Sequence, residues 1–251
     1  MDVAELRAFY STRLGRLTRQ TISHVLEQNF SASPDMRLVG FGYASPYLNA
    51  VTEQSPLAIS LMPAQQGVVA WPSKGPNRAA LVQDFDLPLP DSSVDRMLVV
   101  HGLEQSVHPL TFLKEAWRVL VPGGKVCLVV PRRTGLWARM DTTPFGQGRP
   151  FSGGQLERAL KDALLTPEIW LRALHYAPMD KRLLLRPSAR LEKIGRIAWP
   201  AFAGVAVVVA SKHLYQGLKT GERLNFRALS RPVLVPSPNT SNPRRRSSAG
   251  L

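Results

Sequence analysis

The segment 94–101, "VDRMLVVH", restricts the fold more than any other part of the sequence, because its residues 97–100 are all apolar. A β-strand points successive side chains to opposite faces, so an unbroken apolar run indicates a strand that is buried on both faces. Parallel sheets that are covered by helices on both sides bury their strands in this way. The segment therefore predicts a central strand of an α/β domain.

Strand-like and helix-like patterns alternate along most of the chain. Strands are expected at 36–41, 57–62, 79–83, 94–101, 125–131, 168–178 and 203–212. Helices are expected at 2–28, 46–54, 109–120, 156–165 and 188–198. This alternation implies parallel strands joined by right-handed crossovers. We expect a helical extension over 1–30, one α/β domain over 31–228 and a basic, disordered tail over 229–251.

The chain carries a formal net charge of +14, from 32 Lys and Arg against 18 Asp and Glu. The excess is concentrated in 172–196 and in the tail, which contains the run 244–246 of three arginines. Nucleic acid, an anionic membrane surface and an acidic substrate are the partners that such charge favours. The basic residues are not interleaved with aromatic residues as in a base-stacking platform, so nucleic-acid binding remains an alternative only.

The cysteine, histidine and apolar content argue against a disulfide-bonded, a membrane-spanning or a metal-binding protein. Cys127 is the only cysteine, which excludes a disulfide within the chain and favours a cytoplasmic location. The longest apolar run, 199–210, is much shorter than the ~20 residues that cross a bilayer. The five histidines do not cluster at metal-ligand spacing, so no metal site is predicted. The sequence does not indicate an oligomeric state.

The middle of the chain contains an ordered series of short motifs. These are Leu87-Pro88-Leu89, Asp91, Asp95, Leu103-Glu104-Gln105 and the segment 118–124, "RVLVPGG". In this order and spacing, residues 87–133 resemble the core block of class I S-adenosylmethionine-dependent methyltransferases, in particular the type 11 methyltransferase family. The resemblance implies a Rossmann-like, three-layer sandwich. Its seven-stranded sheet would be mostly parallel with an antiparallel last strand, and S-adenosylmethionine would be the cofactor.

The glycine loop of that family falls on residues 38–51, "LVGFGYASPYLNAV", in a changed form. The family's acidic position corresponds to Gly40, and its three glycine positions correspond to Gly42, Ala44 and Pro46. The resemblance implies cofactor contacts from this loop, by Gly40, Phe41, Gly42, Tyr43 and Ala44. The enzyme hypothesis needs open space beside Gly40 and Gly42, and a side chain such as Tyr43 or Met62 filling that space would overturn it.

Two further cofactor contacts are implied by the resemblance. The family usually ends its second strand with an acidic residue that binds the ribose hydroxyls, but this chain has Met62 there, followed by Gln65 and Gln66. A neutral Gln bonds a hydroxyl more weakly than a carboxylate does. Asp84 is the expected adenine contact, with Phe85 packing on the ring. Asp86 is an alternative to Asp84 that the sequence does not distinguish.

His101 is the candidate catalytic residue. It follows the predicted strand 94–101, at the carboxyl edge of the sheet where ligands bind in open α/β folds. Methyl transfer is an in-line displacement that depends mainly on orientation, and an acceptor with a bound proton also needs a base. Histidine titrates near neutral pH and suits that role. A histidine that only lines the cofactor pocket is the alternative.

The long segment 132–151, "RRTGLWARMDTTPFGQGRPF", is a candidate lid. Arg132, Arg133 and Arg149 would bind an anionic group of the acceptor, and Trp137 would pack over the ligand. A solvated loop whose charges serve solubility is the alternative.

The sequence thus predicts S-adenosylmethionine-dependent methyl transfer to a small acceptor, with an anionic group as one option. Two alternatives stay open. One is a protein of methyltransferase fold that has lost catalysis and serves as a binding or regulatory module. The other is a nucleic-acid-associated protein.

Overall fold

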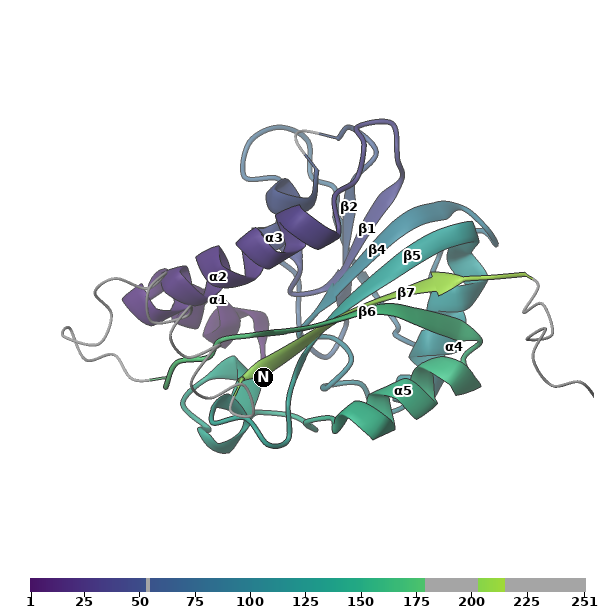
Figure 1. Cartoon of the computed structure of the whole chain (residues 1–251). Helices are drawn as coiled ribbons and strands as arrows, with labels where there is room; N and C mark the ends of the chain where they lie inside the picture. Colours follow the sequence, from purple (N-terminus) through teal and green to yellow (C-terminus); the bar gives the residue numbers. More distant parts are fainter. Residues whose placement is uncertain (53–54, 179–202, 215–251) are drawn as a thin grey trace, which may run out of the picture. The chain divides into compact units, whose positions relative to one another are not determined.

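The computed structural model describes residues 1–52, 55–178 and 203–214. They form one sheet between two layers of helices, the predicted α/β sandwich (Figure 1). The strand order is β3-β2-β1-β4-β5-β7-β6. The strands are β1 (Leu38–Gly42), β2 (Ile59–Pro63), β3 (Ala79–Val82), β4 (Val94–Val100), β5 (Leu120–Pro131), β6 (Leu165–Ala173) and β7 (Val205–Lys212). The predicted fold class is therefore confirmed.

The last strand runs antiparallel to both of its neighbours, as predicted. β7 pairs with β5 from Lys125↔Ser211 to Pro131↔Val205, and with β6 from Leu165↔Lys212 to Ala173↔Val205. The other pairs, β1–β2, β1–β4, β2–β3 and β4–β5, are parallel. Consequently β1, β4, β5 and β6 all end at the same edge of the sheet, which is the edge that positions the candidate site.

The helices divide between the two faces of the sheet (Figure 1). Helices α2 (Arg13–Asn29) and α3 (Ser45–Val51) cover one face, and α4 (Pro109–Val119) and α5 (Gly153–Asp162) cover the other. Two separate apolar clusters result. The first packs α1 (Val3–Ser11), α2 and α3 against the sheet, and the second packs α4 and α5 against it. The N-terminal helices therefore contribute to the core of the domain.

The single helix predicted for 2–28 is in fact two helices. α1 (Val3–Ser11) ends at Thr12, whose backbone is extended and whose side-chain oxygen accepts a hydrogen bond from the Gly15 amide at the start of α2. Thr12 thus ends one helix and caps the next. Its side-chain hydrogen bond to the backbone competes with a continuous helix, and the apolar periodicity of the sequence does not reveal this. α1 itself begins with a complete capping box between Asp2 and Glu5.

Most remaining boundaries agree with the predictions to within three residues. The strand predicted for 168–178 is β6 (Leu165–Ala173), which ends five residues earlier, and β5 also differs. The segment 121–124, "VPGG", was expected to separate a helix from a strand, but β5 starts at Leu120 and includes it. No helix of the described residues is long and apolar enough to cross a membrane. The predicted helix 188–198, most of the basic segment 172–196 and the tail 229–251 lie outside the described residues.

Candidate functional site

His101 follows β4 directly, at the carboxyl edge of the sheet, and its side chain is completely buried. Its backbone φ is +50°, a left-handed conformation that is rare for residues other than glycine. Strained backbone of this kind persists where the surrounding structure holds it, and it is common at functional sites. The position of His101 at the edge of the central strand agrees with the sequence prediction.

A chain of hydrogen bonds runs through His101. The Tyr47 hydroxyl donates to the Tyr10 hydroxyl at 2.7 Å, and the Tyr10 hydroxyl lies 2.8 Å from His101 Nε2. On its other side, His101 Nδ1 lies 3.1 Å from Glu104 Oε1. Since Tyr10 already accepts from Tyr47, its own proton points to Nε2, and Nδ1 carries the proton that Glu104 accepts. In this arrangement Nε2 faces the Tyr10 hydroxyl and Nδ1 faces the Glu104 carboxylate.

Burial favours the neutral, protonated form of the Tyr10 and Tyr47 hydroxyls. Desolvation, together with the neighbouring Tyr47, raises the pKa of Tyr10 well above its usual value, and desolvation likewise raises the pKa of Tyr47. The Tyr10 ring also stacks on Tyr43, with ring centroids 5.5 Å apart. On the far side of His101, Phe145 packs at a centroid distance of 4.6 Å.

Three buried polar atoms near His101 lack a hydrogen-bond partner in the described part of the chain. They are Glu104 Oε2, Gln105 Nε2 and Gln66 Oε1. Gln66 is fixed by its amide, which donates to the His101 carbonyl oxygen at 2.8 Å. Buried polar atoms without partners are costly, so this group is a place where a bound molecule would be stabilised.

Two cavities adjoin these residues. One, of about 270 Å³, is lined by Glu104, Gln105, Gln65 and Arg149 among others. The second, of about 250 Å³, shares Gln65 with the first and is lined by Asp84 and Phe85. Together they run from the end of β3 to the segment after β4, which is the region where the cofactor contacts were expected.

The structure favours Asp84 over Asp86 as the residue in this region. Asp84 lines the cavity and its Oδ2 accepts a hydrogen bond of 2.6 Å from the Ser106 hydroxyl. Asp86 is exposed and does not line it. Phe85 is also exposed at 53%, so its ring is accessible to a planar ligand.

The expected open space beside Gly40 and Gly42 is not found. A Cβ on Gly40 would lie 2.9 Å from the Leu48 side chain and 3.0 Å from Ala44 Cβ. A Cβ on Gly42 would lie 2.4 Å from the Val100 carbonyl oxygen, and Gly42 has a φ of +74°. The two glycines therefore allow the loop to pack against α3 and β4.

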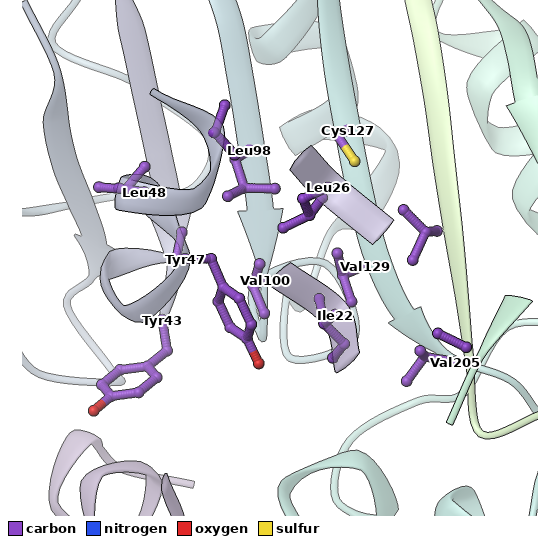
Figure 2. Packing of buried hydrophobic residues seen from close by; sticks show 14 of the residues in the cluster. Ile22, Leu26, Tyr43, Tyr47, Leu48, Leu98, Val100, Cys127, Val129 and Val205 are labelled. Atoms are coloured by element: carbon purple, nitrogen blue, oxygen red, sulfur yellow. The ribbon is translucent and has the colours of Figure 1, made fainter. Parts of the chain in front are cut away.

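The side chains around this loop belong to the core. Tyr43 and Tyr47 lie beside Val100 near the end of β4, and Leu48 packs in the same cluster (Figure 2). Met62 is fully buried at the end of β2, where its sulfur accepts the Val69 amide at 3.4 Å. The loop residues predicted to bind the cofactor, from Gly40 to Ala44, are all buried.

The residues of the predicted lid lie in different places. Trp137 is fully buried and its indole N–H donates to the Tyr176 carbonyl oxygen at 2.7 Å. Arg149 lines the cavity beside Glu104, whereas Arg132 lines a separate and larger cavity. Arg133 is exposed and lines none of these three cavities. The segment 132–151 is thus anchored by its aromatic residues.

Sequence reasoning did not assign roles to Glu104 or Tyr47, and it considered Gln66 only as a weak partner for the ribose hydroxyls. Glu104 lies three residues after His101 within the quoted family motif, and this spacing is the signal that could have linked the two side chains. Tyr47 and Tyr10 come from separate helices, so their contact arises only from the packing of α1 on α3.

A sequence model of a methyltransferase domain matches residues 39–128. This match spans β1 to β5, including His101 and the glycine loop. Over residues 39–128 the chain is therefore similar to the methyltransferase domain family. No curated protein matches the chain significantly.

Solved structures show the same fold as this methyltransferase domain. An S-adenosylmethionine-dependent methyltransferase of Thermotoga maritima, described as a possible histamine N-methyltransferase, has 17% identity and a TM-score of 0.57, covering 84% of this chain and 96% of its own. The putative methyltransferase bound to the Haloferax volcanii Trm112 activator has 16% identity and a TM-score of 0.58, with 85% and 100% covered.

A third structure contains the demethylated cofactor. The geranyl diphosphate C-methyltransferase of Streptomyces coelicolor A3(2), solved with S-adenosyl-L-homocysteine, has 14% identity and a TM-score of 0.51, with 76% and 79% covered. At these identities the likeness concerns the fold. The fold of the chain is that of class I S-adenosylmethionine-dependent methyltransferases.

Proposed function

We propose that this methyltransferase domain binds S-adenosylmethionine and methylates a small acceptor that is held against His101. The observation that carries the proposal is the buried chain Tyr10–His101–Glu104 beside two cavities at the carboxyl edge of the sheet. The unpartnered atoms of Glu104, Gln105 and Gln66 support a ligand in this place. The cofactor, when bound, supplies an electrophilic methyl group on a sulfonium.

The residues of the two cavities suit the polar and planar parts of such a cofactor. Asp84 and Phe85 offer a carboxylate and an exposed ring for a base. Glu104 Oε2 is a buried carboxylate oxygen that can accept a hydrogen bond from a hydroxyl group, a role that Met62 at the end of β2 cannot fill. Glu104 therefore takes, in this proposal, the place of the acidic residue that the family has at the end of β2.

His101 would act as the base for the acceptor. Its Nε2 accepts a hydrogen bond, and Glu104 holds the Nδ1 proton and stabilises the imidazolium that forms on proton uptake. The Tyr10 hydroxyl, 2.8 Å from Nε2, occupies the position that an acceptor hydroxyl would take. An acceptor must therefore displace Tyr10 from His101. Arg149, on the wall of the neighbouring cavity, is the cation that an anionic acceptor group would reach.

Calorimetric titration with S-adenosylmethionine and S-adenosylhomocysteine tests the cofactor part. We expect micromolar binding of both. Asp84→Asn should weaken both by about tenfold, since a charge-assisted hydrogen bond is worth about 1.5–3 kcal/mol. Asp86→Asn is the matched control, because it removes the same charge two residues away and outside the cavity. Equal weakening in both variants would contradict the assignment of Asp84.

Methyl transfer is tested by the release of S-adenosylhomocysteine with a panel of small hydroxyl-containing acceptors. His101→Gln should remove turnover and leave the affinity for S-adenosylmethionine within about threefold of wild type. Turnover that survives in His101→Gln at neutral pH would show that His101 only lines the pocket.

A binding or regulatory role without catalysis is the second candidate. The close packing of Leu48 and Ala44 against Gly40 supports it, because this is the space that the enzyme hypothesis requires. Absence of binding by either S-adenosyl compound, in protein that melts cooperatively, would establish this alternative over the enzyme.

A further inference from the structure

The largest of the three cavities described, about 730 Å³, lies away from the candidate site. Its walls come from the end of β5, the start of β7, the end of β6 and the start of α5, with Val25 of α2 at one side. It shares no residue with the two cavities beside His101. We refer to it as the β6 groove.

The register of the sheet explains why the surface is hollow here. Val130 of β5 is opposite Ala206 of β7, and Ala206 is opposite Arg172 of β6. All three line the groove. Residues directly opposite each other in antiparallel strands project from the same face of the sheet. The small Ala206 between two larger side chains leaves room above the middle strand.

Two guanidinium groups face this hollow. Arg172 lines it from β6 and Arg132 lines it from the residue after β5. Partial burial and the nearby positive charge of Arg172 lower the pKa of Arg132. Both arginines have other interaction partners in the chain, yet a guanidinium carries five N–H donors and can bind more than one group. An anion between them would be attracted by both positive charges.

The start of α5 adds backbone donors. Ser152 caps this ten-residue helix by accepting the Gln155 amide, and Gly153 and Gly154 form its first turn. Both glycines are exposed, and a Cβ on either would meet open space. A helix N-terminus favours negative charge. Glu157 also lines the groove, but its carboxylate is paired with Lys161 at 2.7 Å.

The rest of the groove is largely apolar. Phe151, Leu156 and Trp170 line it, and Trp170 is 42% exposed. His175 contributes a further polar group. A ligand with one anionic end and an apolar body would therefore be matched at both ends, and the volume is typical of small-molecule sites.

We propose that the β6 groove binds an organic phosphate, with the phosphate between Arg132, Arg172 and the first turn of α5 and an apolar body against Phe151 and Trp170. The planar guanidinium of each arginine can donate two hydrogen bonds to phosphate oxygens. A phosphate dianion also carries more negative charge than a carboxylate, so two arginines attract it more strongly. This site goes beyond the proposed methyl transfer, because none of its residues lines the cavities assigned to cofactor and acceptor.

Titration of the full chain with phenyl phosphate, followed by calorimetry, tests the proposal. We expect saturable one-to-one binding, tighter than that of inorganic phosphate because of the apolar wall and tighter than that of benzoate because of the charge. Arg172→Gln and Arg132→Gln should each weaken phenyl phosphate binding by roughly tenfold. Arg133→Gln is the matched control, since it removes the same charge from an exposed neighbour outside the groove.

A second variant adds charge without removing an arginine. Gly153→Glu places a carboxylate in the open space at the start of α5, where it also suits the helix dipole. It should abolish phenyl phosphate binding without lowering the melting temperature. S-adenosylmethionine affinity should be unchanged in all four variants, which separates this site from the proposed function.

Three results would overturn the proposal. They are no saturation at millimolar phenyl phosphate, equal loss in Arg133→Gln and Arg172→Gln, and undiminished binding in Gly153→Glu. Equal loss of binding in Arg133→Gln and Arg172→Gln would mean that the net positive charge of the chain, not the groove, attracts the anion.

Discussion

The Tyr10 hydroxyl is the residue-scale feature that links the N-terminal helices to the candidate site. It accepts from Tyr47 and lies against His101 Nε2, and all three side chains are buried. Removing it leaves Tyr47 and His101 without their partner, and a buried polar group left unpaired costs about 1–3 kcal/mol.

Tyr10→Phe should therefore lower the free energy of unfolding by about 1–3 kcal/mol in denaturant titrations. Tyr43→Phe is the control, because its ring stacks on Tyr10 while its hydroxyl has no hydrogen bond recorded within the described residues. A loss in Tyr43→Phe as large as that in Tyr10→Phe would show that ring packing, not the hydroxyl chain, sets the stability here.

Gly40 marks a second residue-scale feature, the tight contact between the glycine loop and α3. Gly40→Ala places a methyl group 2.9 Å from the Leu48 side chain and 3.0 Å from Ala44 Cβ, which should cost about 1–3 kcal/mol by overpacking. Gly153→Ala, where the same methyl meets open space, should be neutral or stabilising. The measurement is the midpoint of thermal unfolding. An unchanged midpoint in Gly40→Ala would mean that the loop has room for a ligand after all.

At the scale of elements, two buried aromatic residues hold the segment 132–151 against the domain. Trp137 packs edge-on against Phe145 with ring centroids 5.6 Å apart, and Phe145 in turn contacts His101. A side chain at Gly204 would collide with the Trp137 ring at 2.2 Å. The sequence suggested a lid because the segment is long and arginine-rich, but the buried side chains attach it to the domain.

Trp137→Ala should release this segment from the core and cost about 3–5 kcal/mol. Trypsin should then cut after Arg132, Arg133 or Arg139 faster than in the wild type, which mass spectrometry of the fragments would detect. Leu136→Ala, at the exposed neighbouring position, is the control and should leave the cleavage rate unchanged. Rapid cleavage of the wild-type segment would instead favour an open lid.

At the scale of the whole molecule, three buried tyrosines contribute to the loss of stability at alkaline pH. Burial raises the pKa of Tyr10, Tyr43 and Tyr47 in the folded protein, whereas the unfolded chain has the ordinary value of about 10. Above that pH the unfolded state loses protons that the folded state keeps. The stability conferred by burying neutral tyrosines is therefore complete below about pH 10 and falls as the pH rises.

Denaturant titrations at pH 8 and pH 11 should accordingly show a lower free energy of unfolding at pH 11. The absorbance of tyrosinate near 295 nm should increase together with the loss of far-ultraviolet circular dichroism. Tyr47→Phe should make the decrease smaller, since one of the three groups is then absent. Ionisation of all tyrosines in protein that remains folded would contradict the predicted raised pKa values.

The sequence by itself determined the strands of the sheet and the place of His101, because apolar periodicity is a local signal. The antiparallel last strand was implied by the family resemblance of residues 87–133. The sequence also predicted Asp84 and Phe85 as cofactor contacts, and both line a cavity at the end of β3. It left open whether Asp84 or Asp86 faces the cavity, because both follow the same strand and only the fold orients them.

Only the tertiary structure decided how the site is filled. Some contacts join segments that are distant in sequence, such as Tyr10 with His101. Others depend on how elements pack or on strand register, such as Gly40 with Leu48 and Ala206 with its neighbours in the β6 groove. A pattern of residue types predicts which elements form, but the space between their side chains depends on close packing. For this reason the altered glycine loop could be located from the sequence, while its tight packing could not.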